Sequence, residues 1–153
     1  ALNAVIDAAG DEGEELEVRR RATESAGFAE YADAGALIES AIDSGLASMG
    51  AGALRAMGNS ADERWEPDVL AALDDARPDI RLEAARAAGS LALGGAVDGL
   101  VRLVDDPDVA TRAVAVWALG EIGGELARGV LEALLIETDD PALEETIEDA
   151  LAP

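Results

Sequence analysis

The sequence contains no cysteine, no histidine and no lysine, and its aromatic residues are two Trp, one Tyr and one Phe. Without cysteine or histidine the chain cannot form disulfides, Cys/His zinc sites, thiol nucleophiles, imidazole general bases or a Ser-His-Asp triad. The longest apolar runs, such as 114–119, are only a few residues long and too short to span a membrane. These absences predict a protein that is not an enzyme, with no metal and no cofactor.

Positive charge is also scarce. The chain has 33 acidic residues and 11 basic ones, all of them arginine, which gives a formal net charge of −22. A nucleic acid or an anionic membrane surface would be repelled, so we expect neither as a partner. The chain opens at Ala1 without the basic and apolar regions of a signal peptide, which makes the cytoplasm the expected compartment. Two explanations of the acidity stay open. One is adaptation to high salt, and the other is an ordinary acidic protein from a high-GC genome.

The sequence repeats with a period of 31 residues. Of the 153 residues 34 are alanine, and glycine recurs at Gly27, Gly58, Gly89 and Gly120. An alanine stands five residues before each of these glycines and an apolar residue directly before it. Agreement at several independent positions indicates an internal repeat.

Each period holds two helical patterns, a short one with apolar residues at i, i+3 and i+4 and an alanine-rich one. The expected helix pairs are 1–9 with 15–28, 33–43 with 46–58, 63–74 with 78–91, 95–105 with 108–121, and 125–136 with 141–151. We expect the paired glycines 94–95 and 123–124 to supply left-handed turns. Short turns make consecutive helices antiparallel, and stacking of the pairs gives one continuous core. The prediction is an all-α superhelix, an α-solenoid, in one domain 1–153 with repeats of about 1–30, 31–61, 62–92, 93–123 and 124–153.

The segments 106–124 and 81–89 resemble HEAT repeats, more narrowly the short bacterial HEAT-like type of the phycobilisome lyases. This resemblance implies the armadillo-like superhelix, with the second helix of each pair on the concave side. It also implies a ladder in which an Asp in the turn within a repeat pairs with an Arg six residues later. Asp75 with Arg81 and Asp106 with Arg112 match that pattern. The earlier repeats depart from it, since Ser44 precedes Gly50 and Gly13 precedes Arg19.

Paired carboxylates are the only candidates for acid–base chemistry. Asp74-Asp75, Asp105-Asp106 and Asp139-Asp140 recur at the repeat spacing, in turns. That placement is typical of helix caps and ladder partners, so we interpret these acids as structural.

The concave surface offers a candidate binding stripe. The position three residues before each repeated glycine holds Glu24, Arg55, Arg86 and Trp117, and position six before holds residues such as Arg21 and Glu83. The candidate partner-binding residues are Arg20, Arg21, Arg55, Arg86 and Trp117. Arginine and tryptophan are typical anchors of protein interfaces, and Arg86 is placed to approach the ring of Trp117. The alternative is that the arginines neutralise Glu24 and Glu83 while Trp117 packs into the stack.

The sequence therefore predicts a scaffold that binds a protein or peptide on its concave face and is a monomer or weak homodimer. Two alternatives remain. The chain is either a lyase-type or chaperone-like subunit that handles a bilin or another acidic ligand, or a structural module of a larger protein.

Overall fold

The structure, a computed structural model, describes residues 2–11, 13–28 and 32–152, and every regular element in these ranges is helical. In chain order the elements are α1 (Leu2–Gly10), α2 (Leu16–Ala26), α3 (Ala32–Asp43), α4 (Ala47–Asn59), the 3₁₀ turn η1 (Glu63–Trp65), α5 (Glu66–Ala72), α6 (Pro78–Ser90), the 3₁₀ turn η2 (Gly94–Ala96), α7 (Val97–Leu103), α8 (Val109–Ile122), α9 (Gly124–Glu137) and α10 (Pro141–Leu151). The expected helix pairs are present, with ends that differ by a few residues.

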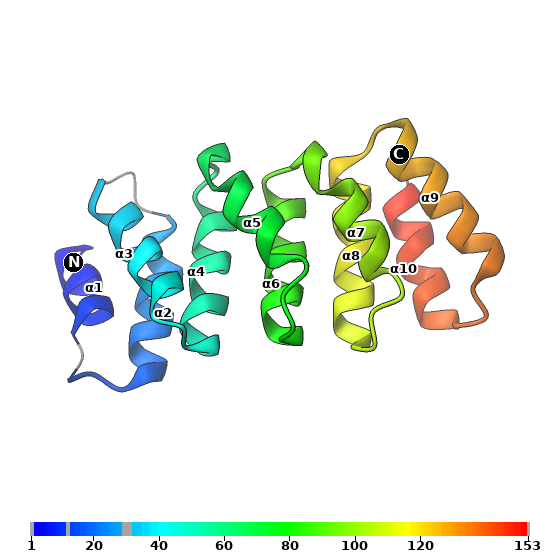
Figure 1. Cartoon of the computed structure of the whole chain (residues 1–153). Helices are drawn as coiled ribbons and strands as arrows, with labels where there is room; N and C mark the ends of the chain where they lie inside the picture. Colours follow the sequence, from blue (N-terminus) through cyan, green and yellow to red (C-terminus); the bar gives the residue numbers. More distant parts are fainter. Residues whose placement is uncertain (1, 12, 29–31, 153) are drawn as a thin grey trace.

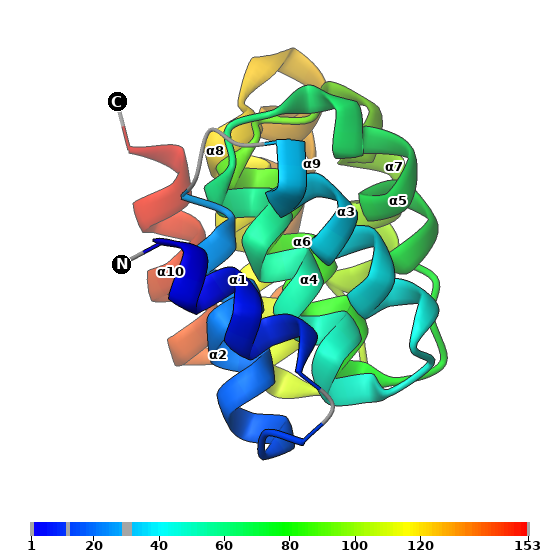
Figure 2. The same ribbon diagram turned by 90° about the vertical axis from the view of Figure 1, so that its left-hand side faces the viewer.

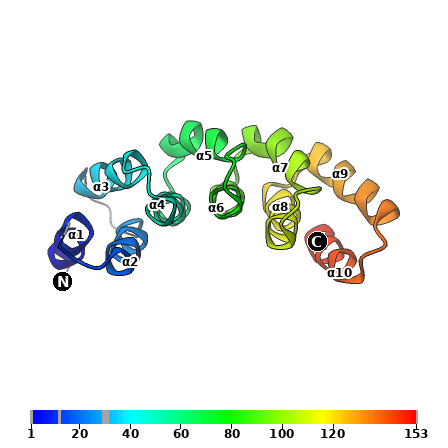
Figure 3. The same ribbon diagram turned by 60° about the horizontal axis from the view of Figure 1, so that its bottom comes forward.

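The helix pairs stand side by side from the N-terminus to the C-terminus (Figure 1). Figure 2 looks along this stack, with α3, α5 and α7 on one side of α4 and α6. Figure 3 shows the curvature: α3, α5, α7 and α9 form the outer, convex row, and α2, α4, α6, α8 and α10 form the inner, concave row. The predicted all-α superhelix is confirmed, with the second helix of each pair on the inside.

The repeated glycines explain why the inner row is packed so closely. A Cβ added at Gly89 would lie 2.9 Å from the Cα of Ala118 and 2.7 Å from Cζ3 of Trp117. Each repeated glycine faces the same place on the next inner helix, in the pairs Gly27 with Ala56, Gly58 with Ala87, Gly89 with Ala118, and Gly120 with Ala150. Successive inner helices touch through backbone, which is possible only where a glycine meets an alanine.

The core lies between the two rows. Val69, Leu100 and Leu119 have no exposed surface, and the small alanines of the inner helices are equally buried. Trp65, where other repeats have alanine, is only 4% exposed and packs into this core. No helix in the described part of the chain is long and apolar enough to cross a membrane.

The turns after the inner helices differ from the expectation at one place. Gly123 and Gly124 do have positive φ, at 65° and 83°. Gly94 and Gly95, however, begin the 3₁₀ turn η2, and the left-handed residue of that repeat is Ala92, with φ of 49°. The equivalent residue one repeat earlier, Ala61, has φ of 52°. The left-handed position thus recurs with the period, but an alanine fills it twice.

Candidate functional site

The turn acids form structural contacts. Asp74 accepts two hydrogen bonds from Nη2 of Arg102, at 2.9 and 3.0 Å, across 28 residues of sequence. Asp140 caps α10 by accepting from the amide of Ala142 at 3.0 Å. Within the described residues no three acidic side chains are grouped as a metal site would require. In each pair at least one carboxylate therefore holds a turn or a neighbouring repeat in place.

The arginine ladder connects repeats in a way that the resemblance did not predict. Arg81 directs its side chain to Asp106 in the next repeat, with Nε–Oδ2 at 2.7 Å and Nη2–Oδ1 at 3.0 Å. Within its own repeat, Arg81 donates only to the backbone carbonyls of Asp75 and Ala76. The expected side-chain pair of Asp75 with Arg81 is therefore wrong, because the side chain of Arg81 reaches the carboxylate in the turn of the next repeat.

Asp106 is the most enclosed carboxylate of this ladder, with a side chain only 4% exposed. Hydrogen bonds from Arg81 and from the amide of Asp108 hold its pKa below the ordinary value, against the opposing effect of burial. Arg112 makes the backbone contact of the same kind, from Nη1 to the carbonyl of Asp106 at 2.8 Å. Its carboxylate partner is missing, since Thr138 stands two residues before the N-cap of α10, where the preceding repeats have Asp.

The concave wall carries a second set of ion pairs, on α2, α4 and α6. Arg55 of α4 reaches Glu83 of α6, with Nε–Oε2 at 3.1 Å, and also lies 3.7 Å from Glu24 of α2. Arg86 lies 3.4 Å from the same Glu83, whose side chain is only 5% exposed. Glu83 is thus buried beneath two guanidinium groups, although the sequence placed it on the solvent side. The alternative interpretation, in which the arginines neutralise acidic neighbours, describes this half of the wall.

The two remaining arginines of the candidate stripe lie at its N-terminal end. Arg20 pairs with Glu24 and Glu17, and Arg21 pairs with Glu17 at 3.0 Å. These contacts, with Arg20 as the main cause, lower the pKa of Glu17 to about 2. Arg21 is the most exposed of the four and the one with the greatest freedom to contact another molecule.

Trp117 lies on α8, in the C-terminal half of the concave wall. Its ring edge packs over Gly89, and the residue lines a hollow of about 340 Å³. The acids that line this hollow are Glu121 of α8 and Glu145 and Asp149 of α10. Arg86, which was expected near this ring, is held by Glu83 instead, and the cation–π contact that the described residues make is Arg64 over Trp65, at 4.4 Å.

The five candidate residues therefore belong to two different regions. Arg20, Arg21, Arg55 and Arg86 follow α2, α4 and α6 in a series of ion pairs, while Trp117 lines a hollow together with three acids. None of the three acids of this region is among the binding residues that the sequence predicted. Their common signal is the absence of any arginine from α10 and from α8 beyond Arg112.

The model of the family described as HEAT repeats matches residues 66–152. The chain belongs to the HEAT repeat family. Its fold is similar to the complex of CpcE and CpcF of phycocyanin lyase from Nostoc sp. PCC7120, with a TM-score of 0.67, 16% identity, and coverage of 97% of this chain and 62% of that chain. It is also similar to a designed armadillo repeat protein in complex with the peptide (KR)4, with a TM-score of 0.69, 21% identity, and coverage of 99% and 80%. An engineered protein matches equally well, with a TM-score of 0.69, 20% identity, and coverage of 98% and 77%. No curated protein matches the sequence.

Proposed function

We propose that this HEAT repeat chain is a non-enzymatic scaffold that binds a basic segment of a protein or peptide along its concave face. The observation that carries the proposal is the position of Trp117 beside Glu121, Glu145 and Asp149. No ion pair with any described arginine neutralises these three acids. An aromatic ring bordered by acids suits a lysine or arginine side chain, which gains a cation–π contact and charge compensation together.

The charge pattern of the rest of the wall supports a basic partner over an acidic one. An acidic partner would have to take Arg55 and Arg86 away from Glu83, which would then remain buried without a counter-charge. Glu17 and Glu24, the acids that pair with Arg20 and Arg21, are more exposed than Glu83. We propose both arginines as secondary contacts for acidic groups that flank the basic segment. The designed armadillo repeat protein, whose complex contains (KR)4, supplies a precedent for a basic peptide on a similar superhelix.

Fluorescence of Trp117 provides the direct test. In a Trp65→Phe background Trp117 is the only tryptophan, and we expect (KR)4 to shift its emission saturably at about 0.15 M salt. The peptide (ED)4 should leave the emission unchanged. Binding of (ED)4 as tight as that of (KR)4 would overturn the proposed polarity of the site.

A pair of matched variants separates the site from general attraction to an acidic chain. Glu121→Gln with Asp149→Asn removes two charges beside Trp117 and should weaken (KR)4 binding at least tenfold. Glu137→Gln with Asp139→Asn removes two charges at the end of the outer helix α9 and the following turn, and should change binding less than twofold. Equal effects of the two double variants would show that the peptide binds by non-specific electrostatic attraction, and they would reject the site.

The similarity to the phycocyanin lyase complex supports a second candidate, a subunit that handles a linear tetrapyrrole. Mixing the chain with such a pigment and recording the visible absorption spectrum tests it. A saturable shift of the absorption band that persists in Trp117→Ala would place the pigment elsewhere than the proposed peptide site.

A further inference from the structure

The ladder consists of contacts between an arginine of one repeat and an aspartate of the next. At one of these steps the aspartate is present but the arginine is absent. The position eight residues before the repeated glycine holds Arg19, Gly50, Arg81 and Arg112. Arg81 reaches Asp106, and the equivalent acid for position 50 is Asp75, one 31-residue period earlier. Gly50 has no side chain to reach it. Between the second and third repeats, the ladder therefore presents a carboxylate without the guanidinium that pairs with it one repeat later.

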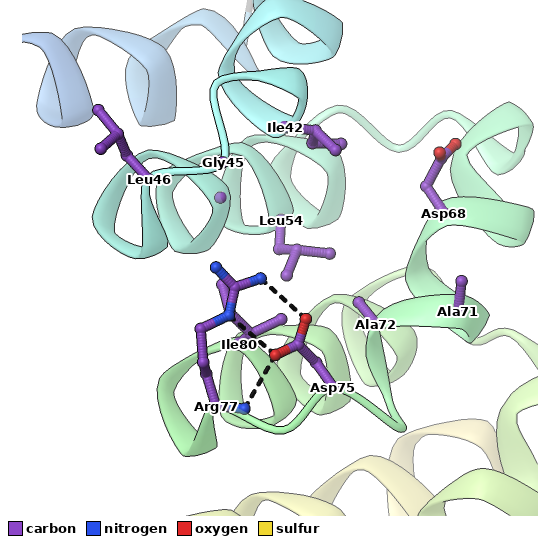
Figure 4. Close-up of a pocket in the computed structure, with 11 residues that line it drawn as sticks. Ile42, Gly45, Leu46, Leu54, Asp68, Ala71, Ala72, Asp75, Arg77 and Ile80 are labelled. Atoms are coloured by element: carbon purple, nitrogen blue, oxygen red, sulfur yellow. Dashed lines mark hydrogen bonds and ion pairs between the residues drawn. The ribbon is translucent and has the colours of Figure 1, made fainter.

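A cavity lies at this step, with a volume of about 240 Å³. Its walls are apolar on several sides, from Ile42, Leu54 and Ile80, and Asp75 lies at one end (Figure 4). An engineered protein cavity of about 150 Å³ accommodates benzene, so this space is sufficient for the seven heavy atoms of an arginine side chain. The carbonyl groups that Arg81 contacts in the next step correspond here to those of Ser44 and Gly45, and Gly45 lines the cavity.

Arg77 supplies a guanidinium at this step from a different position of the chain, and it lines the cavity itself. It occupies the N-cap of α6, where the next repeat has Asp108, and folds back onto Asp75 with Nε–Oδ1 at 2.9 Å and Nη2–Oδ2 at 2.8 Å. These contacts lower the pKa of Asp75 to about 2, so the acid is charged at neutral pH. Arg77 is 44% exposed, whereas Arg81 in the complete step is 14% exposed. The cavity lining still holds two carboxylates, Asp68 and Asp75, against one guanidinium.

We propose that this cavity accepts an arginine side chain from a partner protein, which lies against Ile42, Leu54 and Ile80 and pairs with Asp75. The incoming guanidinium takes the place that Arg81 takes one repeat later, and Arg77 swings away into solvent. The site uses the turns between α3 and α4 and between α5 and α6. It is therefore separate from the surface around Trp117 and does not depend on the function proposed there.

Binding of a short arginine peptide tests the proposal. With the uniformly labelled full chain, the peptide Gly-Gly-Arg-Gly-Gly should produce saturable NMR shifts at the methyl groups of Ile42, Leu54 and Ile80. The matched peptide with citrulline, which has the same shape without the charge, should bind at least ten times more weakly. Equal binding of the two peptides would make the cavity a simple apolar hollow and overturn the proposal.

Three variants then identify the residues responsible. Gly50→Arg supplies the missing side chain from within and should abolish peptide binding while raising the melting temperature. Asp75→Asn keeps the turn hydrogen bond to the amide of Arg77 and should weaken binding at least tenfold. Arg77→Ala removes the competitor and should tighten binding several-fold. Unchanged binding in Asp75→Asn would reject the site even if Gly50→Arg does not fold.

Two further measurements decide the source of the arginine. Propylguanidinium that binds while the peptide does not would point to a small molecule instead of a partner chain and would overturn the proposal. Dimerisation of the free chain that the peptide reverses, measured by sedimentation, would identify a second copy of this chain as the occupant and would also overturn it. Unchanged peptide binding in Trp117→Ala is the result expected if the two sites are independent.

Discussion

Arg81 and Asp106 come from successive repeats, and two hydrogen bonds of 2.7 and 3.0 Å join the guanidinium of one to the carboxylate of the other. The same guanidinium holds two backbone carbonyls of its own turn. A single side chain therefore fixes the distance between two turns, in a stack whose repeats contact only their neighbours. Loss of this contact should loosen the interface between the third and fourth repeats.

Asp106→Asn tests that contact. We expect the free energy of unfolding at pH 7 to fall by about 1–3 kcal/mol, because a guanidinium that is only 14% exposed loses its charged partner. The pKa of Asp106 is lowered in the folded chain, so its contribution is present above the unfolded pKa of about 3.9 and is lost as pH falls through the folded pKa. The variant should therefore lose less stability than the parent between about pH 5 and pH 2 in urea denaturation.

The control is Asp105→Asn, at the exposed neighbouring residue, which should behave like the parent. If the stability of Asp106→Asn fell with pH as steeply as that of the parent, the role of Asp106 would be contradicted.

Gly89→Ala tests the close contact of the inner helices. The added methyl group would lie 2.9 Å from the Cα of Ala118, which is backbone that cannot move by itself, so we expect a loss of about 1–3 kcal/mol by overpacking. Gly129→Ala is the matched control, since Gly129 lies inside α9 with nothing within 4 Å of an added Cβ. It should instead gain about 0.5–1 kcal/mol from the helical preference of alanine. Chemical denaturation of both variants checks the opposite signs, and a stabilised Gly89→Ala would refute the contact.

The 31-residue period was enough to predict the fold because glycine, which has no side chain, marks the same position in each repeat. A glycine that recurs at Gly27, Gly58, Gly89 and Gly120 marks a position where nothing larger fits, whatever surrounds it. The same period predicts which positions are equivalent, but not which neighbour a long side chain contacts. Arg81 has two candidate partners, Asp75 within its own repeat and Asp106 in the next one. Which of the two it contacts depends on the spacing between the folded repeats.

The candidate site was predicted less completely for a related reason. The sequence placed Arg55, Glu83 and Arg86 on one surface of the inner helices, and they do lie together. The burial of Glu83 depends on how α4 and α6 pack in the folded chain, which puts Glu83 beneath both guanidinium groups. Because Glu83 then holds Arg86, the pairing of Arg86 with Trp117 does not form.

Ala92→Gly tests the left-handed turn after α6. Ala92 has φ of 49°, and the amide of Leu93 donates to the carbonyl of Ala88 at 3.0 Å, so this conformation closes the helix. A left-handed residue with a Cβ costs about 1–2 kcal/mol, and the extra unfolded-state entropy of glycine costs about 0.5–1 kcal/mol. We therefore expect a net gain of about 0.5–1 kcal/mol in chemical denaturation. Ala133→Gly, at an exposed position inside α9, should lose about 1 kcal/mol, and the same loss in Ala92→Gly would show that the turn is not strained.

The thermal stability of the chain should rise with salt, because its net charge of −22 is not balanced within the fold. Every arginine is already engaged: nine form ion pairs, while Arg19 and Arg112 donate to backbone carbonyls. The surplus carboxylates repel one another, and salt reduces that repulsion as the screening length falls from about 10 Å at 0.1 M to about 3 Å at 1 M. Melting curves in sodium chloride between about 0.1 and 2 M check this, with sucrose at matched osmolality as the control for solvent exclusion. A melting temperature that stays constant would remove adaptation to high salt as the explanation of the acidity, and a rise confined to sodium chloride would favour it.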